Sequence, residues 1–279
     1  MQIEVLEMDE TKAKLLIYDA EPQIVNALRR TLIADIPKMA IEEVDFHLGP
    51  ISTSEDGRVA DGSTPLFDEI IAHRLGLIPI PTDLKRFNFR SECEHPPDEA
   101  CPLCTITYTL HKVGPCTVYS GDLEPINGPE FRPKDELIPI VELSEGQAIY
   151  ITANAILGTG KEHAKWQVTS GVGYKYYPIV TIDDSKCNHN CKKCLDVCPK
   201  DVFDLVDDKI VVKNPENCSL CNACVQECPD AVKVEGDPTK FIFQFETDGS
   251  LTAEETLKYA LEHLAERFEK LRENISELS

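Results

Sequence analysis

CNHNCKKCLDVCP (residues 187–199) and CSLCNACVQECP (residues 218–229) are near-copies of one cysteine pattern, and they carry the strongest structural signal in this chain. They hold eight of its twelve cysteines. Each run offers three closely spaced thiolates and a fourth directly before proline, and thiolates are the soft ligands that iron–sulfur clusters require. The spacing therefore predicts a small ferredoxin-like domain that binds two 4Fe-4S clusters.

The order of the cysteines predicts how they divide between the clusters. In two-cluster ferredoxins the cysteine before proline binds the other cluster, so each cluster draws one ligand from the distant run. We therefore expect a first cysteine set of Cys187, Cys191, Cys194 and Cys228, and a second cysteine set of Cys218, Cys221, Cys224 and Cys198. The first run has three residues between its first two cysteines where two are usual. A 3Fe-4S cluster at the first set is the alternative that this extra residue leaves open.

Two other uses of paired cysteines compete with iron–sulfur binding. Zinc accepts Cys-x2-Cys elements, but tandem triplets that each end in Cys-Pro favour iron–sulfur clusters. A disulfide framework needs an oxidising compartment, and the sequence starts with a strand-like segment, Ile3–Leu6, rather than with a signal peptide. We therefore expect reduced thiols in the cytoplasm.

The composition limits the classes of partner. Over 279 residues the formal net charge is −21, which argues against direct contact with the phosphate backbone of nucleic acids. No apolar stretch reaches the ~20 residues of a membrane-spanning helix. The length is sufficient for two or three domains.

The N-terminal segment has the pattern of two strands and a helix. Gln2–Glu7 and Lys12–Tyr18 predict strands joined by a polar turn. Pro22 suits the first turn of a helix that Pro37 ends, with an apolar residue at every fourth position. The polar face of this helix, either solvated or a docking surface for an acidic partner, carries Asn26, Arg29 and Arg30.

The middle of the chain has the pattern of strands around one short helix. Met39–Leu48 predicts a strand. Thr64 is expected to cap a helix that begins at Pro65 and ends at Gly76. Period-two patterns between residues 105 and 182 then indicate a mostly β unit.

The C-terminal segment predicts a strand and a long helix. Three phenylalanines alternate along a half-buried strand, Lys240–Thr247. Thr252 and Glu255 form a capping box, and a helix with one apolar seam follows. The seam comprises Leu257, Leu261, Leu264, Phe268, Leu271 and Ile275. A helix of roughly 25 residues spans about 38 Å, so part of the seam is expected to contact a second chain. Packing on its own sheet and self-association are the alternatives.

These elements predict an α+β fold in which the two ends of the chain form one discontinuous platform domain. Its expected bounds are residues 1–48 and 238–279. Residues 49–182 would form an inserted β-rich domain, and residues 183–237 the inserted ferredoxin-like domain.

Four residues outside the cysteine runs form another candidate metal site. Cys93, Cys101 and Cys104 offer a thiolate triplet and His95 an imidazole, a ligand combination that suits zinc. Free thiols in a reducing cytoplasm are the alternative. Cys116 stands alone and is expected to be an ordinary small apolar residue.

Three further motifs resemble those of the alpha-type assembly subunits of RNA polymerase. They are Val25–Leu32 with Ile36–Ile41, Asp68–Pro79, and Gly158–Trp166. Together with the ferredoxin-like insert, they make the chain similar over essentially its whole length to the archaeal D subunits of this family. The same family includes bacterial alpha and the eukaryotic third-largest subunit.

The resemblance implies a non-catalytic subunit of the DNA-directed RNA polymerase, because the family's nucleotide addition takes place in the two largest subunits. It implies that the platform domain is a dimerisation domain that pairs with the small subunit L. The helix residues Asn26, Arg29 and Arg30 would dock the second-largest subunit of the polymerase. Contacts with large subunits or with subunit N are expected at His73, Arg74, His163, Lys165 and Trp166. Eukaryotic counterparts carry a four-cysteine zinc loop, and Ser91 occupies the position of its first cysteine here.

The clusters are expected to stabilise the insert and thereby to regulate assembly of the polymerase. A ferredoxin-type electron carrier is the alternative function, and a scaffold protein unrelated to transcription is another. Both alternatives leave the three alpha-type motifs unexplained.

Overall fold

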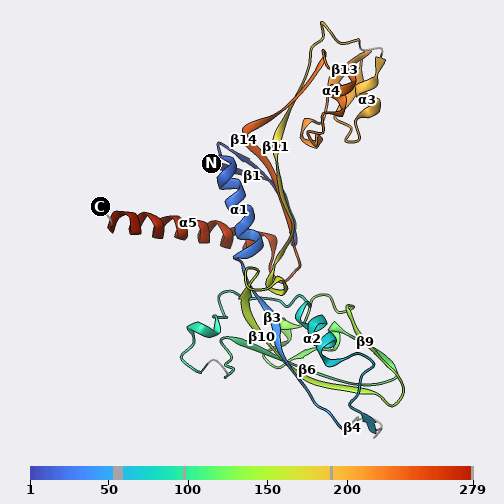
Figure 1. Cartoon of the computed structure of the whole chain (residues 1–279), viewed down its shortest axis with the longest axis vertical. Helices are drawn as coiled ribbons and strands as arrows, with labels where there is room; N and C mark the ends of the chain where they lie inside the picture. The colour runs from blue at the N-terminus through green and yellow to red at the C-terminus, as the bar shows by residue number, and fades with distance from the viewer. Residues whose placement is uncertain (53–58, 97–98, 189–190, 278–279) are drawn as a thin grey trace. The chain divides into compact units, whose positions relative to one another are not determined.

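Figure 1 shows the computed structural model of the chain, which describes residues 1–52, 59–96, 99–188 and 191–277. The chain forms two compact units. The first unit contains residues 1–8, 12–29 and 171–245, and the second contains residues 9–11, 30–170 and 246–279. Helices and strands are mixed, with sheets predominating, so the expected α+β class is confirmed. The division into three domains stays a prediction.

A four-stranded sheet with the order β1-β2-β14-β11 forms the base of the first unit. Its strands are β1 (Gln2–Met8), β2 (Lys12–Tyr18), β14 (Val232–Thr247) and β11 (Thr169–Ile182). The β1 and β2 strands pair antiparallel, as the polar turn between them predicts. Buried and partly exposed side chains alternate along β2, which indicates that the sheet buries one face.

Aromatic side chains from two adjacent strands pack together in this unit. Phe241, Phe243 and Phe245 of β14 are fully buried. The ring of Tyr174 on β11 lies 5.8 Å from that of Phe241 and 6.3 Å from that of Phe243. Such ring pairs add stability beyond the area that they bury. The predicted strand is confirmed, but it begins at Val232 rather than at Lys240.

The cysteine runs lie between β11 and β14 in the sequence, and each contains a short helix. The elements here are α3 (Lys193–Val197), the β12 (Phe203–Val206) and β13 (Lys209–Val212) pair, the 3-10 helix Pro215–Asn217, and α4 (Ala223–Glu227). The residues before the two α-helices, Lys192 and Asn222, both have left-handed backbones, with φ of 50° and 62°. The repeated sequence thus produces a repeated local structure around a small apolar core.

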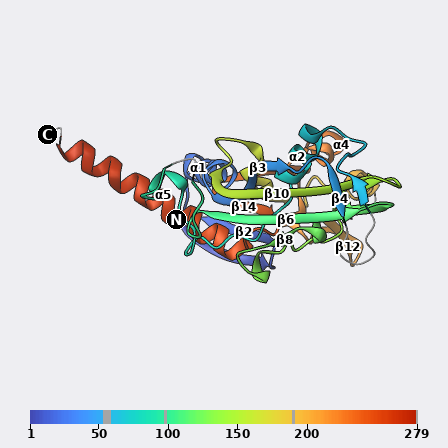
Figure 2. The same cartoon turned by 90° about the horizontal axis from the view of Figure 1, so that it is seen from below.

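An antiparallel sheet with the order β3-β10-β6-β8 forms the centre of the second unit. Its strands are β3 (Pro37–Phe46), β10 (Ala148–Thr159), β6 (Thr105–Val113) and β8 (Glu124–Pro125). Figure 2 shows β10 and β6 side by side. Further pairs are β4 (Pro50–Ser52) with β5 (Val59–Asp61), and β7 (Cys116–Tyr119) with β9 (Pro139–Leu143). Short 3-10 helices span Arg90–Glu92 (η1), Ser120–Asp122, Pro129–Phe131 and Ala164–Trp166.

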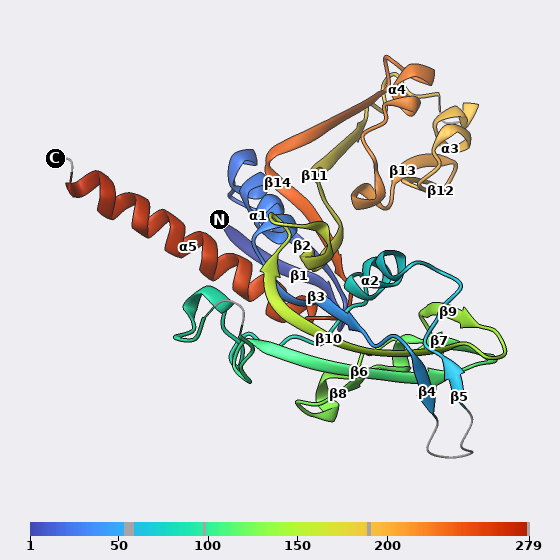
Figure 3. The same ribbon diagram turned by 60° about the horizontal axis from the view of Figure 1, so that its bottom comes forward.

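The helix α2 (Asp68–Gly76) lies against the strands β3 and β9 of the second unit (Figure 3). Its side chains Ile71 and Leu75 are fully buried in the largest apolar core of the described residues. That core also contains Met39 of β3 and Ile106 of β6. The helix therefore packs at the β3 edge of the central sheet.

The start of α2 differs from the expected one. The helix begins at Asp68 rather than at Pro65, and Phe67 occupies its N-cap without a side-chain hydrogen bond. The Thr64 hydroxyl donates to the carbonyl of Leu66 at 2.6 Å. The expectation that Thr64 caps the helix is therefore wrong, because its hydroxyl stabilises a turn ahead of the helix instead.

Two longer helices complete the fold. The helix α1 (Pro22–Ala34) begins in the first unit and ends in the second, and α5 (Ala253–Glu277) belongs to the second. The predicted capping box of α5 is confirmed, since the Glu255 N–H donates to Thr252 Oγ1 at 3.2 Å and the Thr252 N–H donates to Glu255 Oε2 at 3.2 Å. Among the helices of the described ranges, none combines the length and the apolar character of a membrane span.

A buried ion pair fixes the start of α5 to the central sheet of the second unit. The side chain of Lys38 on β3 is 3% exposed and pairs with Asp248 in the turn before α5. Asp248 also accepts the N–H of Ser250 at 3.0 Å. The N–H of Thr82 donates to the Ser250 carbonyl at 2.9 Å, and the Thr82 hydroxyl accepts the N–H of Met39 at 3.0 Å. This network joins β3, the loop after α2 and the root of α5.

We expect Asp248→Asn to lower the free energy of unfolding by roughly 3 kcal/mol, because it leaves the buried Lys38 ammonium without a counter-charge. Chemical denaturation of the full chain measures the change. The control is Lys258→Met, which removes an exposed ion pair with Glu254 and should change stability by at most about 0.5 kcal/mol. Equal effects of the two variants would contradict the structural role of the buried pair.

Candidate metal centres and contact surfaces

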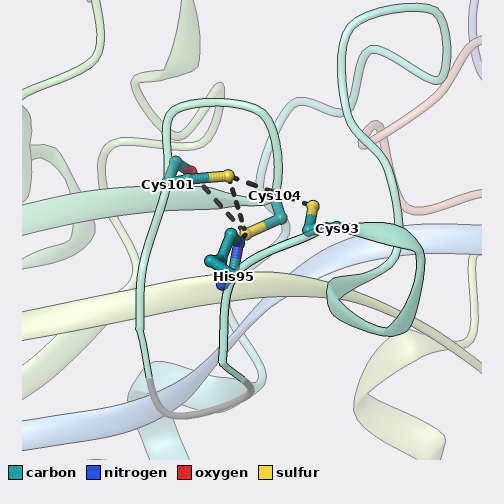
Figure 4. A group of neighbouring side chains, drawn as sticks. All are labelled: Cys93, His95, Cys101 and Cys104. Atoms are coloured by element: carbon teal, nitrogen blue, oxygen red, sulfur yellow. Dashed lines mark hydrogen bonds between the residues drawn. The ribbon is translucent and has the colours of Figure 1, made fainter.

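Four predicted metal ligands converge in the loop between η1 and β6 of the second unit. Figure 4 shows the side chains of Cys93, His95, Cys101 and Cys104 pointing toward one another. One ligand atom from each lies within 4.8 Å of the others. The Sγ atoms of Cys101 and Cys104 are 3.4 Å apart, and Nε2 of His95 lies 3.3 Å from the Cys104 Sγ.

The imidazole of His95 is oriented as a metal ligand would be. Its Nδ1 lies 2.8 Å from the carbonyl oxygen of Pro96, so a proton on Nδ1 satisfies that carbonyl and leaves Nε2 free toward the thiols. Histidines that bind metals commonly donate their other ring N–H to a backbone carbonyl in this way. The donor set and its orientation therefore fit one metal ion.

Electrostatics in this loop also favour a cation. Burial first, and then the neighbouring Cys101 and Cys104 thiols, raise the pKa of Cys93 to about 11. The Pro96 carbonyl, with the Cys104 thiol, raises the pKa of His95 to about 9. Without an ion both ring nitrogens therefore carry a proton near neutral pH, and a metal ion would displace the proton on Nε2. Burial opposes ionisation of Cys104, but hydrogen bonds from its neighbours outweigh it and lower the pKa of this thiol to about 7. Crowded thiols repel one another as thiolates, and a divalent ion would relieve that repulsion.

A bidentate ion pair anchors the loop to the central sheet. The guanidinium of Arg90 in η1 contacts both carboxylate oxygens of Glu43 on β3, at 3.0 and 3.3 Å. The Arg90 guanidinium lowers the pKa of the Glu43 carboxyl below its ordinary value. The loop enters β6 directly after Cys104. Both ends of the ligand loop are thus attached to the sheet before any ion binds. No local pattern in the sequence indicates this pair, because its members lie 47 residues apart.

The first cysteine set is brought together in the first unit. Burial raises the pKa of the Cys187 thiol, and the charges of Cys191 and Cys228 raise it further. Burial, Cys228 and Cys187 likewise raise the pKa of Cys194 to about 11. Cys228, from the second run, therefore lies among the three thiols of the first run. Residues 189–190 of that run lie outside the described residues.

The second cysteine set shows the reciprocal arrangement. Burial raises the pKa of Cys224, followed by the charges of Cys218 and of Cys198 from the first run. All four cysteines of this set line one pocket, together with the apolar side chains Val180, Val202 and Phe203. Thiol-only donors in an apolar lining fit an iron–sulfur cluster. Cluster binding itself stays a prediction for both sets.

The predicted contact residues fall into exposed and internal groups. Arg30, His73 and Arg74 are exposed, and Asn26 and Arg29 are partly exposed. Beside His73, the α2 region also exposes three apolar side chains that the sequence analysis did not single out: Phe67 (77%), Ile70 (41%) and Leu77 (63%). These three residues are separated by three and seven positions, a helical spacing that could have indicated an apolar surface at α2 in the sequence.

The residues of the Gly158–Trp166 motif make contacts inside the second unit. Trp166 is 7% exposed, and its Nε1 donates to the Ile156 carbonyl at 3.1 Å. A Cβ atom on Gly158 would lie 2.4 Å from the Trp166 ring, which explains the glycine. Lys165 Nζ donates to the Ile41 carbonyl at 3.0 Å, and His163 Nδ1 accepts the Lys165 N–H at 3.1 Å. Contacts of these residues with other subunits stay a prediction.

The apolar seam of α5 changes from buried to exposed along its length. Leu257 is 8% exposed, whereas Phe268, Leu271 and Ile275 are 52%, 54% and 58% exposed. Every described residue from Ala265 to the end of the helix is exposed. The distal part of the seam is therefore exposed in the part of the chain that the structure describes.

Comparison with known proteins places these features in one family. The RNA polymerase Rpb3/Rpb11 dimerisation domain matches residues 14–268. The chain belongs to this family. A DNA-directed RNA polymerase subunit Rpo3 from Picrophilus torridus is 50% identical over 275 residues, which cover 99% of this chain and 100% of the relative. The Rpo3 subunits of Thermoplasma volcanium and Archaeoglobus fulgidus are 48% and 38% identical, over 99% of this chain and 100% and 98% of the relatives. The resemblance found in the sequence motifs is confirmed.

We expect the Cys/His loop to bind one Co²⁺ ion per chain, with the thiolate-to-metal absorption of tetrahedral sulfur coordination. Cys101→Ser should weaken binding at least tenfold, because it removes one of three thiolates. The matched control is Cys116→Ser, which removes a cysteine outside the four ligands. To separate this loop from the cysteine runs, all variants carry serine at the eight cysteines of the first and second sets. Unchanged binding in Cys101→Ser would rule out the loop as a metal site.

Proposed function

We propose that this chain is a non-catalytic assembly subunit of a cytoplasmic DNA-dependent RNA polymerase, which pairs with the small subunit L to form the platform for the large subunits. The match to a dimerisation domain across residues 14–268 carries this proposal. The names of the Rpo3 relatives, which describe polymerase subunits, support it. Catalysis of nucleotide addition then belongs to the assembled complex.

The uncovered part of the α5 seam supports pairing with another chain. Three large apolar side chains, more than half exposed, follow one another at helical spacing over residues 268–275. A seam of this kind is stabilised when a second helix packs along it. The start of α5 is held by the buried Lys38–Asp248 pair, and Arg267, just before the exposed part of the seam, pairs with Asp35 at 3.2 Å. The partner would thus meet a helix that is already positioned.

Other exposed groups are suited to the remaining subunits. We assign Asn26, Arg29 and Arg30 to the docking of the second-largest subunit, and His73 with Arg74 to a large subunit or subunit N. The exposed apolar side chains Phe67, Ile70 and Leu77 extend the surface that contains His73 and Arg74. Arg74 donates to the Ile140 carbonyl at 2.6 Å, which holds its side chain on the surface of the second unit.

The metal sites would serve folding rather than catalysis. The eight cysteines of the two sets would hold two 4Fe-4S clusters, with 3Fe-4S as the alternative at the first set, and the Cys/His loop would hold zinc. The apolar core beside the cysteine sets is small, so ligand binding would supply much of the folding free energy of this region. Assembly could in this way respond to oxygen or iron supply.

Leu271→Glu should weaken binding to subunit L by at least about 100-fold, because it places a charge in the middle of the proposed helix seam. Isothermal titration with purified L measures the affinity. Lys270→Ala, next to it on the same exposed part of α5, should leave the affinity within about threefold of the original. If Leu271→Glu binds L normally, the seam is not the dimer interface. A loss of self-association instead, seen in the mass of the chain alone, would indicate a homodimer.

Anaerobic reconstitution should load about eight iron atoms per chain, or about seven if the first set holds a three-iron cluster. An eightfold Cys→Ser variant should take up no cluster iron. We expect this variant to bind L but to recruit the large subunits poorly, because its insert would lose the ligands that organise it. Co-purification of the subunits tests this. Full assembly with normal thermal stability would leave the clusters without a structural role.

A further inference from the structure

One lysine links the base sheet of the first unit to the loop that supplies the second cysteine set. Lys175 lies on β11. Its Nζ donates to the carbonyl oxygens of Glu216 and Cys218, at 2.6 and 2.7 Å. Cys218 is the first cysteine of the second run and is itself buried. A single ammonium therefore holds two backbone carbonyls around a predicted cluster ligand.

The same loop makes further contacts with the ligand and with the strands. The N–H of Leu220 donates to the Sγ of Cys218 at 3.4 Å. A Cβ atom on Gly236 of β14 would lie 2.7 Å from the Tyr176 Cβ and 3.7 Å from Leu220 Cδ1. The loop of the second set thus lies where β11 and β14 approach each other closely.

Charge reinforces this arrangement. A pocket of the first unit is lined by three lysines, Lys14, Lys175 and Lys200, and by two acidic residues, Asp201 and Glu216. Its three lysines stand out in a chain with a net charge of −21. A cluster held by four thiolates carries net negative charge, which nearby ammonium groups stabilise.

The first cysteine set is attached differently. The N–H of Cys187 donates to the carbonyl of Asp183 at 2.9 Å, a turn within one short segment. Its neighbour Lys186 pairs with Asp183 at 3.4 Å. These two contacts are local, although the Asp183 N–H also donates to the carbonyl of Ala231 at 2.8 Å. At the second set, one lysine side chain holds two carbonyls about 40 positions away.

We propose that Lys175 is a positioning residue that couples iron binding at the second cysteine set to the base sheet of the first unit. The inference rests on the proposed iron–sulfur binding. Iron at the second set holds the Cys218 loop in the form that Lys175 binds, and loss of that iron frees both the loop and β11. The Lys175 charge also favours the reduced state of the cluster at this set.

Iron release from the reconstituted full chain into a chelator tests the proposal. Lys175→Met should release the iron of the second set roughly tenfold faster, since it removes two charge-assisted hydrogen bonds. Lys175→Arg, which retains the charge and the donors, should restore most of the original rate. Lys186→Met, beside the first set, is the matched control and should not alter release from the second.

A second substitution assigns the effect to one set. In a Cys221→Ser background only the first set is complete, and Lys175→Met should then leave the release rate unchanged. In a Cys191→Ser background the acceleration should persist, and electron paramagnetic resonance during a redox titration should show reduction of the remaining cluster at a more negative potential. Hydrogen exchange of β11 should rise on iron loss in the original chain but should already be high in Lys175→Met.

The outcomes separate the two proposals. If the original chain takes up no iron, the iron–sulfur assignment fails, and this inference fails with it. If the chain loads both sets but Lys175→Met releases iron at the original rate, or accelerates release equally in the Cys221→Ser background, only the role of Lys175 is overturned.

Discussion

The burial of one ammonium group, that of Lys38, constrains the second unit. A charge that is 3% exposed needs a counter-charge close by, and the turn before α5 supplies it through Asp248. Leaving such a charge unpaired would cost several kcal/mol. The chain must therefore return from β14 to β3 before α5 can begin. The origin of the helix is fixed by the central sheet, and further along the exposed Arg267 of α5 pairs with Asp35.

Features encoded by neighbouring residues could be predicted from the sequence. The start of α5 follows from Thr252 and Glu255, which are three positions apart, and its apolar seam repeats within each two turns. The start of α2 could not be predicted in the same way. The Thr64 hydroxyl can serve a helix N–H or a nearby carbonyl, and only the path of the backbone decides between them. The early start of β14 was hidden by Gly236 and Pro238, which usually interrupt strands. The close approach of Tyr176 explains that glycine.

The candidate metal site likewise combines features that the sequence reveals with features that only the structure reveals. The residue types of Cys93, His95, Cys101 and Cys104 indicated metal binding, and the structure brings them within reach of one ion. Their support could not be foreseen, because Arg90 and Glu43 are distant in sequence and each resembles an ordinary surface charge. For Trp166, the sequence motif predicted a role that differs from the contacts in the structure. Its motif suggested an outward role, yet the indole lies on Gly158 within the second unit, and no sequence pattern reveals that contact.

The exposed end of α5 has a consequence for the life of the chain in a cell. A solvent-exposed apolar face on an amphipathic helix promotes nonspecific association. Quality-control proteases and chaperones recognise such surfaces. Molecules synthesised in excess of whatever covers this face would be removed or would aggregate. The supply of this chain relative to any protein that covers this face would therefore decide how much of the chain persists in a cell.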